Sequence, residues 1–390
     1  MNRINEEFKT KLYTASGHPR VLVALSGGVD SSVAAALLKR QGYGIEAAYM
    51  RCWSTGPYCT ADQDQADAAA VAAILGIPFH IFDFEKQYQE RVMDYFFKEY
   101  KAGRTPNPDV VCNKEIKFGL FLEKARELGF DYIATGHYAR VSCQEQETRS
   151  QRPAAGDQAT GDWNLATGSY HLLAGVDREK DQSYFLYLLN QEQLAHSIFP
   201  LGELTKKEVR NLAKRFGLPT ADKPDSTGIC FIGEAPMKEF LRQKIKISHG
   251  NIVSVDGKLL GRHIGLPFYT IGQREGLGFS APVPYYVVDK DIANNRLIVA
   301  PFGHEALFKD KFLANGENWV AGVVPHFPLK VQVKLRYRAE NAPATVKRIG
   351  KESLEVNLDQ KERAITPGQS AVFYQGEEVL GGAVIGKVMD

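Results

Sequence analysis

An apolar run followed by a glycine-containing loop and the start of a helix constrains the fold of this 390-residue chain more than any other feature. Residues 21–25 are all apolar, as in a strand that is buried on both faces. The loop Ser26-Gly-Gly-Val-Asp-Ser-Ser32 follows, and the sequence predicts an alanine- and leucine-rich helix over 33–41. Glycines let backbone N–H groups approach a ligand, and the helix dipole favours negative charge at that end. The feature therefore predicts a site for an anion such as phosphate.

The loop differs from the Walker A pattern, because it lacks the lysine that reaches the β- and γ-phosphates there. An ordinary strand-to-helix turn is the alternative interpretation, but the order of strand, loop and helix favours a phosphate site. The sequence of the loop resembles the pyrophosphate loop (PP-loop, SGGxDS) of the ATP pyrophosphatase superfamily. That resemblance implies cleavage of ATP to AMP and pyrophosphate, with a carbonyl group activated as its adenylate.

The first half of the chain alternates short apolar runs with helical patterns. This order predicts an α/β fold with a doubly wound parallel sheet, whose ligands bind at the carboxyl ends of the strands. After about residue 235 short alternating runs take over, which predicts a small central β-rich domain and a C-terminal β-barrel. We expect an ATP-binding domain over 1–235, a central domain over 236–300 and the barrel over 301–390. The polar stretch 141–168 is expected to be a surface insertion or mobile loop.

Composition and charge are typical of a soluble globular protein. No apolar run approaches the roughly 18 residues of a membrane-spanning helix, and the first residues lack the apolar core of a signal peptide. A cytoplasmic location without a membrane partner is therefore expected. The net charge of +2 neither requires nor excludes a nucleic-acid partner. The 5 scattered cysteines do not suggest a disulfide scaffold and leave reactive thiols or a metal site open.

Two of the cysteines stand in distinctive sequence contexts. Cys112 follows a segment with two prolines and is predicted to lie just before a helix over 114–128. A thiol at a helix N-terminus with Lys114 and Lys117 nearby should have a lowered pKa and a nucleophilic thiolate. Cys230 lies in an apolar, strand-like run between two glycines. For either cysteine alone, burial as a small apolar residue is the more common case. A shared chemical role is the better interpretation only if the two thiols lie close together in the fold.

Further motifs are similar to those of the tRNA-specific 2-thiouridylases, and the similarity extends over nearly the whole chain. The phosphate loop alone would indicate only the superfamily, whereas the two cysteine motifs and the C-terminal motifs are more specific. The resemblance implies an adenine nucleotide alpha hydrolase-like first domain and a barrel that contacts tRNA. The motifs are Ala102-Gly-Arg-Thr-Pro-Asn-Pro-Asp109, Cys112-Asn-Lys-Glu-Ile-Lys-Phe118, Ala134-Thr-Gly-His-Tyr138, Lys180-Asp-Gln-Ser-Tyr-Phe185, Asp225-Ser-Thr-Gly-Ile-Cys-Phe-Ile-Gly-Glu234, Leu277-Gly278, Tyr286-Val-Val-Asp-Lys-Asp291 and Thr366-Pro-Gly-Gln-Ser-Ala-Val-Phe-Tyr374.

The resemblance implies a sulfurtransferase in which ATP adenylates the 2-carbonyl oxygen of the wobble uridine of tRNA. Cys230 would then carry a persulfide sulfur with Cys112 as its partner. Either Cys112 resolves an adduct through a Cys112–Cys230 disulfide, or it releases sulfide that attacks the base. Asp30 would be catalytic as the carboxylate associated with Mg²⁺, which balances the charge of the leaving pyrophosphate. Besides tRNA, a persulfide donor such as a cysteine desulfurase or sulfur relay protein would be a partner.

The resemblance also implies which residues bind ATP and tRNA. Asn and Asp side chains can read a base edge, while Tyr and Arg can stack on an unpaired nucleotide. Without the resemblance, a surface turn and a barrel strand would be the simpler interpretations of the Lys180 and Arg336 segments. The implied ATP contacts are Ala24, Leu25, Ser26, Gly27, Gly28, Val29, Asp30, Ser31, Met50 and Gly136. The implied tRNA contacts are Asn107, Pro108 and Asp109 at the target base, and Lys180, Asp181, Gln182, Arg336 and Tyr337 elsewhere.

Some assignments stay open between alternatives. His137 is given a structural or nucleotide-edge role rather than acid–base catalysis, because adenylation needs mainly positioning and charge neutralisation. Cys52 and Cys59 are interpreted as spectator thiols, although an iron–sulfur cluster on Cys112 and Cys230 would take Cys59 as its third ligand. One alternative function is a PP-loop pyrophosphatase that adenylates a small-molecule carbonyl, which needs neither two thiols nor RNA-binding β-domains. The other is a non-catalytic RNA-binding protein, against which the intact loop and both cysteines argue.

Overall fold

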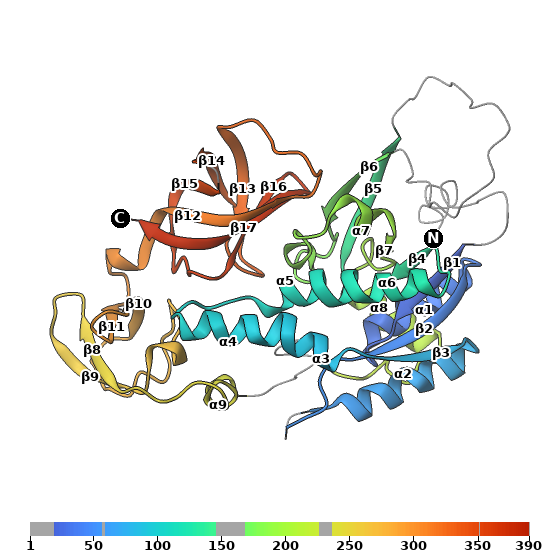
Figure 1. The fold of residues 1–390 in the computed structure, drawn as a ribbon, viewed down its shortest axis with the longest axis horizontal. Helices are drawn as coiled ribbons and strands as arrows, with labels where there is room; N and C mark the ends of the chain where they lie inside the picture. The colour runs from blue at the N-terminus through green and yellow to red at the C-terminus, as the bar shows by residue number, and fades with distance from the viewer. Residues whose placement is uncertain (1–18, 57–58, 146–167, 226–235, 351, 390) are drawn as a thin grey trace.

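The computed structural model describes residues 19–56, 59–145, 168–225, 236–350 and 352–389. Figure 1 shows three parts: an α/β domain, a small β domain formed by the middle of the chain, and a barrel that ends it. Long helices of the α/β domain extend from its sheet toward the other two parts (Figure 1). Within the described residues, no helix has the length and apolar character needed to cross a membrane.

A sheet of parallel strands in the order β3-β2-β1-β4-β7 forms the centre of the α/β domain. Side chains of β1 alternate between two buried clusters: Val21 and Val23 belong to one, and Leu22 and Ala24 to the other. Both faces are therefore covered, which explains the continuous apolar run. The predicted α/β class with a parallel sheet is confirmed. The strands are β1 (Arg20–Ala24), β2 (Gly44–Arg51), β3 (Phe79–Asp83), β4 (Tyr132–Ala134) and β7 (Ser197–Ile198).

Helices cover both faces of this sheet. The apolar sides of α1, α2 and α8 join one buried cluster, and the two long stretches 85–101 and 108–127 join the other. On the first face lie α1 (Val29–Arg40), α2 (Ala61–Leu75) and α8 (Lys206–Arg215). The long stretches are α3 (Glu85–Tyr88), η1 (Gln89–Met93) and α4 (Asp94–Lys101), then α5 (Pro108–Cys112), η2 (Asn113–Leu120) and α6 (Phe121–Glu127). The short η3 (Ser183–Phe185) and α7 (Gln191–Ala195) follow.

The central domain begins with α9 (Met237–Arg242) and holds a mixed sheet in the order β10-β11-β8-β9. It packs on the α/β domain, because Phe240 of α9 lies 5.6 Å from the ring of Phe97 and 5.9 Å from that of Phe96. The elements are β8 (Gly250–Ser254), β9 (Leu259–His263), η4 (Leu266–Phe268), β10 (Tyr285–Asp291) and β11 (Arg296–Pro301).

The C-terminal strands close into a barrel, as predicted. Their order is β12-β15-β14-β13-β16-β17, and β12 pairs again with β17 to complete the ring. The interior is filled by a separate apolar cluster that includes Phe312, Trp319 and Phe373. The elements are η5 (Glu305–Leu307), β12 (Phe308–Trp319), β13 (Leu329–Lys334), β14 (Ala342–Ile349), β15 (Ser353–Arg363), β16 (Ser370–Gln375) and β17 (Glu378–Met389).

A hairpin ties the α/β domain to this barrel. Strands β5 (Ala139–Glu145) and β6 (Gly168–Ala174) pair with each other, and β6 adds to β17. The loop predicted over 141–168 is therefore wrong at its two ends, because residues 141–145 belong to β5 and residue 168 begins β6. Residues 146–167 lie outside the described part of the chain.

Candidate active site

The phosphate loop joins the carboxyl end of β1 to α1 and is held by its own hydroxyl groups. The Ser31 hydroxyl accepts a hydrogen bond from the Ser26 N–H at 3.1 Å and donates to the Gly28 carbonyl at 3.2 Å. The Ser32 hydroxyl donates to the same carbonyl at 2.7 Å. Within the described residues no side chain caps the first turn of α1. Its N–H groups are therefore available to an anion, as the sequence predicts.

Glycine at position 27 has a definite steric reason. Gly27 adopts a left-handed conformation with φ of +73°, and a Cβ there would lie 2.3 Å from the carbonyl oxygen of Asp64 in α2. A second close approach occurs at Gly136, after β4, where a Cβ would lie 2.7 Å from the Ser31 nitrogen. Ala24 and Met50 lie near the carboxyl ends of β1 and β2. The residues predicted to contact ATP thus gather at one edge of the sheet, and their contacts with ATP stay a prediction.

Asp30, in the first turn of α1, is paired with a lysine from a distant helix. The Lys206 ammonium, at the start of α8, donates to the two carboxylate oxygens at 2.7 and 2.8 Å. The Tyr138 hydroxyl donates to the same carboxylate at 2.9 Å. Burial, followed by the charge of Asp30, raises the pKa of Tyr138, so this phenol remains a donor. Asp30 is therefore neutralised by the protein itself.

This pairing bears on the Mg²⁺ predicted at Asp30. Both carboxylate oxygens are bonded to an ammonium group, so a cation there would have to displace Lys206. The described residues also contain no group of three or more His, Cys, Asp or Glu side chains that could hold a metal. The geometry does not fit a preformed Mg²⁺ site, and the metal role of Asp30 stays a prediction.

Lys206 also connects the phosphate loop to the segment that precedes Cys230. Its ammonium lies 2.8 Å from Asp225, which further accepts from Lys180 at 2.7 Å and from Arg210 at 2.5 Å. Burial alone would raise the pKa of Asp225, but hydrogen bonds from Lys180 and Lys206 hold it well below its usual range. Cys230 itself lies outside the described residues. Its predicted meeting with Cys112 is therefore untested.

The helix that carries Cys112 begins earlier than predicted. It starts at Pro108, and the Asn107 side chain caps it by accepting a hydrogen bond from the Asp109 N–H at 3.2 Å. Cys112 therefore lies within a helix and is fully buried, rather than just before a helix over 114–128. That placement was wrong because Asn-Pro-Asp is itself a helix-start signal, with Asn at the cap and Pro at the first helical position. The nucleophilic role of Cys112 stays a prediction.

The barrel holds the backbone that leads into this helix. The Thr105 N–H donates to the Pro367 carbonyl at 2.9 Å. The Gln369 amide donates back to the carbonyls of Thr105 at 2.9 Å and Pro106 at 3.3 Å. A Cβ on Gly368 would lie 2.8 Å from the Thr105 carbonyl oxygen, so the two backbones touch. We call Pro367, Gly368 and Gln369 the barrel clamp.

The Lys180–Phe185 motif reaches the same helix from another side. The Phe185 carbonyl accepts a hydrogen bond from the Asn113 amide at 3.2 Å. The Tyr184 hydroxyl donates to the Ser370 carbonyl at 2.9 Å, next to the barrel clamp. It also lies within hydrogen-bond reach of the Asn107 side chain. Three motifs distant in sequence therefore meet around the segment 105–113.

Within that motif the residues predicted to contact tRNA already bond to the protein. One oxygen of the buried Asp181 accepts from the N–H groups of Gly175 and Ser183 at 3.0 and 3.1 Å. Its other oxygen lies 3.2 Å from the Lys334 ammonium. The Gln182 side chain accepts from the Tyr138 N–H at 3.0 Å. These contacts make Asp181 and Gln182 supports of the site, and their predicted contact with tRNA stays untested.

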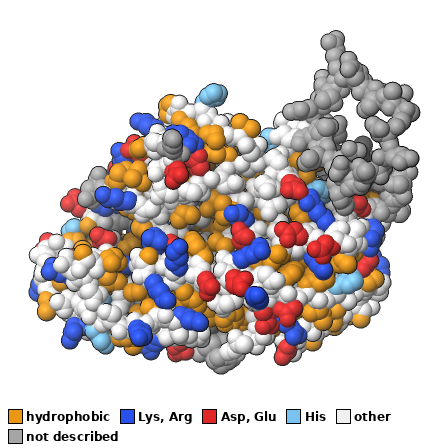
Figure 2. Space-filling model, viewed as in Figure 1, with side chains coloured by type: hydrophobic (Ala, Val, Ile, Leu, Met, Phe, Trp, Pro, Cys, Tyr) orange, Lys and Arg blue, Asp and Glu red, His pale blue; other side chains and the backbone are white. Residues whose placement is uncertain are grey.

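Arg336 and Tyr337 follow β13 in a turn, so the alternative of a barrel strand does not hold for them. The Tyr337 ring lies 4.6 Å from that of Phe185, beside the helix that carries Cys112. The structure thus brings the predicted tRNA residues of the barrel next to those of the α/β domain. Figure 2 shows Lys and Arg side chains prevailing over the lower left of the visible face, where Figure 1 places α4 and the central domain.

His137 is part of an aromatic core. Its Nδ1 lies 2.7 Å from the Thr135 hydroxyl, and its ring lies 5.7 Å from Phe118 and 6.3 Å from Phe199. Burial, with the charge of Lys117 nearby, lowers the pKa of His137 well below its usual value. The imidazole is therefore neutral at pH 7, which agrees with a structural role.

Cys52 and Cys59 follow β2, and Cys52 belongs to the same buried cluster as Cys112. Cys52 is buried, and the Cys59 thiol points to the Trp53 carbonyl, with a distance of 3.5 Å from sulfur to oxygen. The iron–sulfur cluster predicted on Cys59, Cys112 and Cys230 stays untested, since Cys230 is not described.

Two functional candidates were not found from sequence. Lys206 belongs to a basic run that also fits a solvated helix face, and its only local signal is the capping box of Thr205 and Glu208. Gln369 stands in a recognised motif, but nothing in the motif indicates that its amide reaches Thr105.

Comparisons with known proteins cover the whole of this architecture. Residues 19–234 match the model of the tRNA methyl transferase HUP domain, 238–301 that of the tRNA methyl transferase PRC-barrel domain, and 309–385 that of the aminomethyltransferase beta-barrel domain. A tRNA-specific 2-thiouridylase MnmA from Aeromonas salmonicida is 46% identical over 381 residues, which are 95% of this chain and 98% of that protein. The protein of the same name from Streptococcus uberis is 48% identical over 375 residues, 94% of this chain and 95% of that protein.

Solved structures resemble the chain more remotely. A 4-thiouridine synthetase in complex with RNA and bound ATP covers 58% of this chain and 50% of its own, with 18% identity and a TM-score of 0.35. The U34-tRNA thiolase NcsA from Methanococcus maripaludis, with its 4Fe-4S cluster, covers 60% of this chain and 69% of its own, with 18% identity and a TM-score of 0.34.

Proposed function

The chain belongs to the family of the tRNA-specific 2-thiouridylases, and we propose that it works as a tRNA-uridine sulfurtransferase that uses ATP. The strongest structural support is the set of contacts around the helix that carries Cys112. The Lys180–Phe185 motif and the barrel clamp both contact the segment 105–113, which carries Cys112. A small-molecule ATP pyrophosphatase has no need of this junction between a thiol helix and a barrel. That alternative is not favoured by the relatives either.

The proposed chemistry divides into an activation and an exchange. The 2-carbonyl oxygen of the wobble uridine attacks the α-phosphorus of ATP, and pyrophosphate leaves. The N–H groups at the start of α1 and the Ser26 hydroxyl hold the phosphates, since they are preorganised donors at a helix N-terminus. Sulfur then adds to the C2 carbon, and AMP leaves with the former uridine oxygen. The family supplies this sequence of steps, and the loop geometry supports the first.

Two routes for sulfur fit the proposal. In one, the Cys230 persulfide attacks C2 through its outer sulfur. Cys112 thiolate then attacks the inner sulfur, which leaves the outer sulfur on the base and a Cys112–Cys230 disulfide. In the other, Cys112 attacks the persulfide first and frees hydrosulfide, which adds to C2. Both routes form one disulfide for each sulfur delivered, so a two-electron reductant such as a dithiol must restore the thiols before the persulfide donor reloads Cys230.

Several partners belong to the proposal. A persulfide donor protein supplies the sulfur, and tRNA is the acceptor. Mg²⁺ accompanies ATP, but no step is derived through it, because the Asp30 oxygens are bonded to Lys206. An iron–sulfur cluster is the alternative cofactor, which Cys59, Cys112 and Cys230 would hold. Since the substrate is tRNA, a cytoplasmic location is proposed.

A reconstituted assay tests the function. The protein is incubated with ATP, Mg²⁺, a persulfide donor and unmodified tRNA, and nucleosides are analysed for 2-thiouridine. We expect 2-thiouridine together with AMP and pyrophosphate. Cys112→Ser and Cys230→Ser should each abolish thiolation while ATP and tRNA binding stay near wild type, with Cys143→Ser as the matched control. Pyrophosphate release on a small acceptor without any thiolated nucleoside would contradict the proposal, and thiolation by either active-site variant would remove that cysteine from the mechanism.

A further inference from the structure

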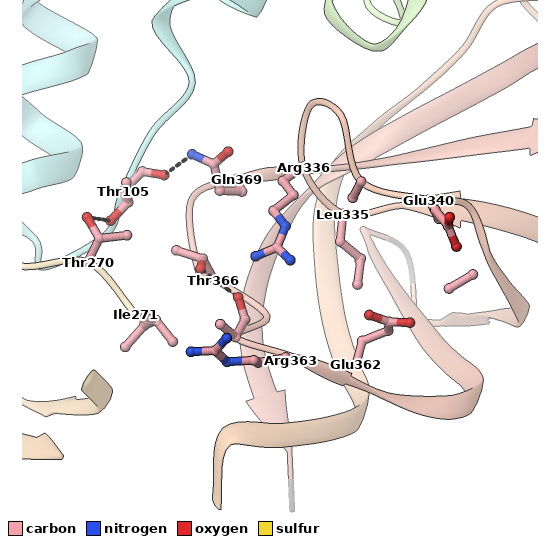
Figure 3. Close-up of a pocket in the computed structure, with 13 residues that line it drawn as sticks. Thr105, Thr270, Ile271, Leu335, Arg336, Glu340, Glu362, Arg363, Thr366 and Gln369 are labelled. Carbon is pink, nitrogen blue, oxygen red and sulfur yellow. Dashed lines mark hydrogen bonds between the residues drawn. The ribbon is translucent and has the colours of Figure 1, made fainter. Parts of the chain in front are cut away.

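A pocket of about 280 Å³ lies where the three parts of the chain meet (Figure 3). Thr105 of the thiol-helix segment forms one wall, Thr270 and Ile271 of the central domain form another, and the barrel supplies the rest. The Thr105 and Thr270 hydroxyls are 3.4 Å apart, so the walls are in contact. The volume is just below the roughly 300–1,000 Å³ typical of small-ligand sites. It suits one small group rather than a folded partner.

Two arginines in this pocket have no carboxylate partner among the described residues. Arg363, at the end of β15, stacks over the Tyr286 ring at 4.2 Å, and its buried Nε has no hydrogen-bond acceptor. Arg336 is exposed in the turn after β13. Figure 3 shows both guanidinium groups on the side of the pocket that faces Thr105 and Ile271. Unpaired guanidinium groups that share a pocket are typical of phosphate recognition.

Two glutamates complete the charge pattern. Glu340 and Glu362 line the same pocket, and Figure 3 shows them on the side away from Thr105 and Ile271. A carboxylate repels a phosphate, but it accepts hydrogen bonds from the exocyclic amino group of a base. Leu335 and Ile271 supply apolar surface along the pocket. The pocket therefore has cationic groups for a phosphate, an apolar wall for a base and carboxylates that accept from an amino group. Together these features match one nucleotide.

The position of the pocket relates it to the reaction. Thr105 is two residues from Asn107, so their Cα atoms lie within about 7 Å. Asn107 begins the segment predicted to meet the target uridine. Tyr337, adjacent to Arg336, packs on Phe185 beside the same helix. A nucleotide held in the pocket would thus be a close neighbour of the target base along the RNA strand.

We propose that this pocket binds one unpaired tRNA nucleotide next to the target uridine, through its phosphate on Arg336 and Arg363 and its amino group on Glu362. The proposal rests on the proposed function, because it assumes a tRNA substrate. It assigns a role to Arg363 that no sequence motif indicates. It also gives the barrel clamp a second role. Gln369 lines the pocket, and its amide donates a hydrogen bond to the Thr105 carbonyl.

The experiment measures binding of unmodified tRNA by the full-length protein over a range of salt concentrations. Arg363→Gln should weaken binding roughly tenfold and reduce the slope of log K against log salt by about 0.7, the contribution of one phosphate on single-stranded RNA. Glu362→Ala removes the acceptor and should weaken binding severalfold. Arg363→Lys keeps the charge, and should restore the salt slope but only part of the affinity. Arg296→Gln, an exposed arginine on β11, is the matched control and should bind as wild type.

Each outcome is decisive. Thermal unfolding of Arg363→Gln and Arg363→Lys shows whether both variants fold, and Arg363→Lys carries the test if Arg363→Gln does not. If the folded variants bind tRNA with unchanged affinity and unchanged salt slope, while the wild type still forms 2-thiouridine, the nucleotide pocket is overturned as a proposal but the proposed function is not. Absence of thiolation in the wild type overturns the proposed function instead. AMP or CMP that binds the wild type and is lost in the Arg363 variants, while tRNA binding is unchanged, assigns the pocket to a free nucleotide and overturns the tRNA proposal.

Discussion

The phosphate loop and the thiol-helix segment 105–113 are built in opposite ways. The loop is braced within 26–32, because hydroxyls of Ser31 and Ser32 bond to Ser26 and Gly28. The segment 105–113 is held by residues far along the chain, through the barrel clamp and the Tyr184–Phe185 contacts. The bonds within the loop leave a motif that can be recognised in the sequence, whereas the contacts that hold 105–113 join two domains and depend on the whole fold. The difference predicts that ATP use and sulfur transfer can be damaged separately.

The largest effect is expected in the local region. Gly27→Ala places a Cβ 2.3 Å from the Asp64 carbonyl oxygen in a left-handed backbone conformation. We expect a loss of about 2–4 kcal/mol in the free energy of unfolding and at least roughly a hundredfold loss of ATP-dependent pyrophosphate release. Gly42→Ala is the control, since Gly42 also has positive φ but nothing within 4 Å. It should lose about 1 kcal/mol and keep its activity. Normal pyrophosphate release by Gly27→Ala would show that the loop is not the activating site.

The remote brace is tested at the barrel clamp. Gln369→Ala removes the hydrogen bonds to the carbonyls of Thr105 and Pro106. We expect kcat/KM for 2-thiouridine formation to fall roughly tenfold, because the segment leading to Cys112 is no longer fixed, while ATP binding stays unchanged. Gln332→Ala, an exposed glutamine on β13, is the matched control. Equal losses of ATP binding and thiolation in Gln369→Ala would mean that the two regions are not separable.

Lys206 is an exception to the local bonding of the phosphate loop, because it connects the loop to a distant helix. Lys206→Met leaves the carboxylates of Asp30 and Asp225 without their shared ammonium. The pair is partly buried, so we expect a loss of about 1–2 kcal/mol in urea unfolding. Lys206→Arg should recover most of it. Lys214→Met, whose ammonium is on an exposed side chain, should change stability by less than about 0.5 kcal/mol. An unchanged free energy of unfolding in Lys206→Met would show that only bonds within 26–32 hold the loop.

A pH dependence is expected on the other side of the segment, at Lys290. The Lys290 ammonium donates to the Gly103 carbonyl at 2.8 Å, and burial lowers the pKa of Lys290 to about 8. Between pH 8 and the unfolded pKa near 10.5, the unfolded state binds more protons. This group therefore makes folding more favourable as pH rises, by at most about 3 kcal/mol. The unfolding free energy of the wild type should rise more steeply from pH 8 to 10 than that of Lys290→Met. Parallel curves would contradict the assignment.

The same contrast explains how much could be predicted from sequence. The sheet, the phosphate loop and the barrel could be predicted, because apolar periodicity and glycine spacing are local signals. The start of the Cys112 helix was misplaced although its Asn-Pro-Asp signal is local. The strand residues at the two ends of 141–168 were not predicted, because the pairing of the hairpin β5–β6 with β17 is remote in sequence. Neither the bond of Lys206 to Asp30 nor that of Gln369 to Thr105 has a sequence signal, since each joins residues more than 170 positions apart.

If the phosphate loop activates the oxygen that sulfur replaces at the thiol helix, that oxygen must leave with AMP, and an isotope label can follow it. A tRNA whose wobble uridine carries ¹⁸O at the 2-carbonyl is reacted in a single turnover with ATP and a persulfide donor. AMP is then analysed by mass spectrometry alongside the 2-thiouridine. We expect one ¹⁸O in the phosphate of AMP for each 2-thiouridine formed. Unlabelled AMP accompanying 2-thiouridine would contradict adenylation of that oxygen.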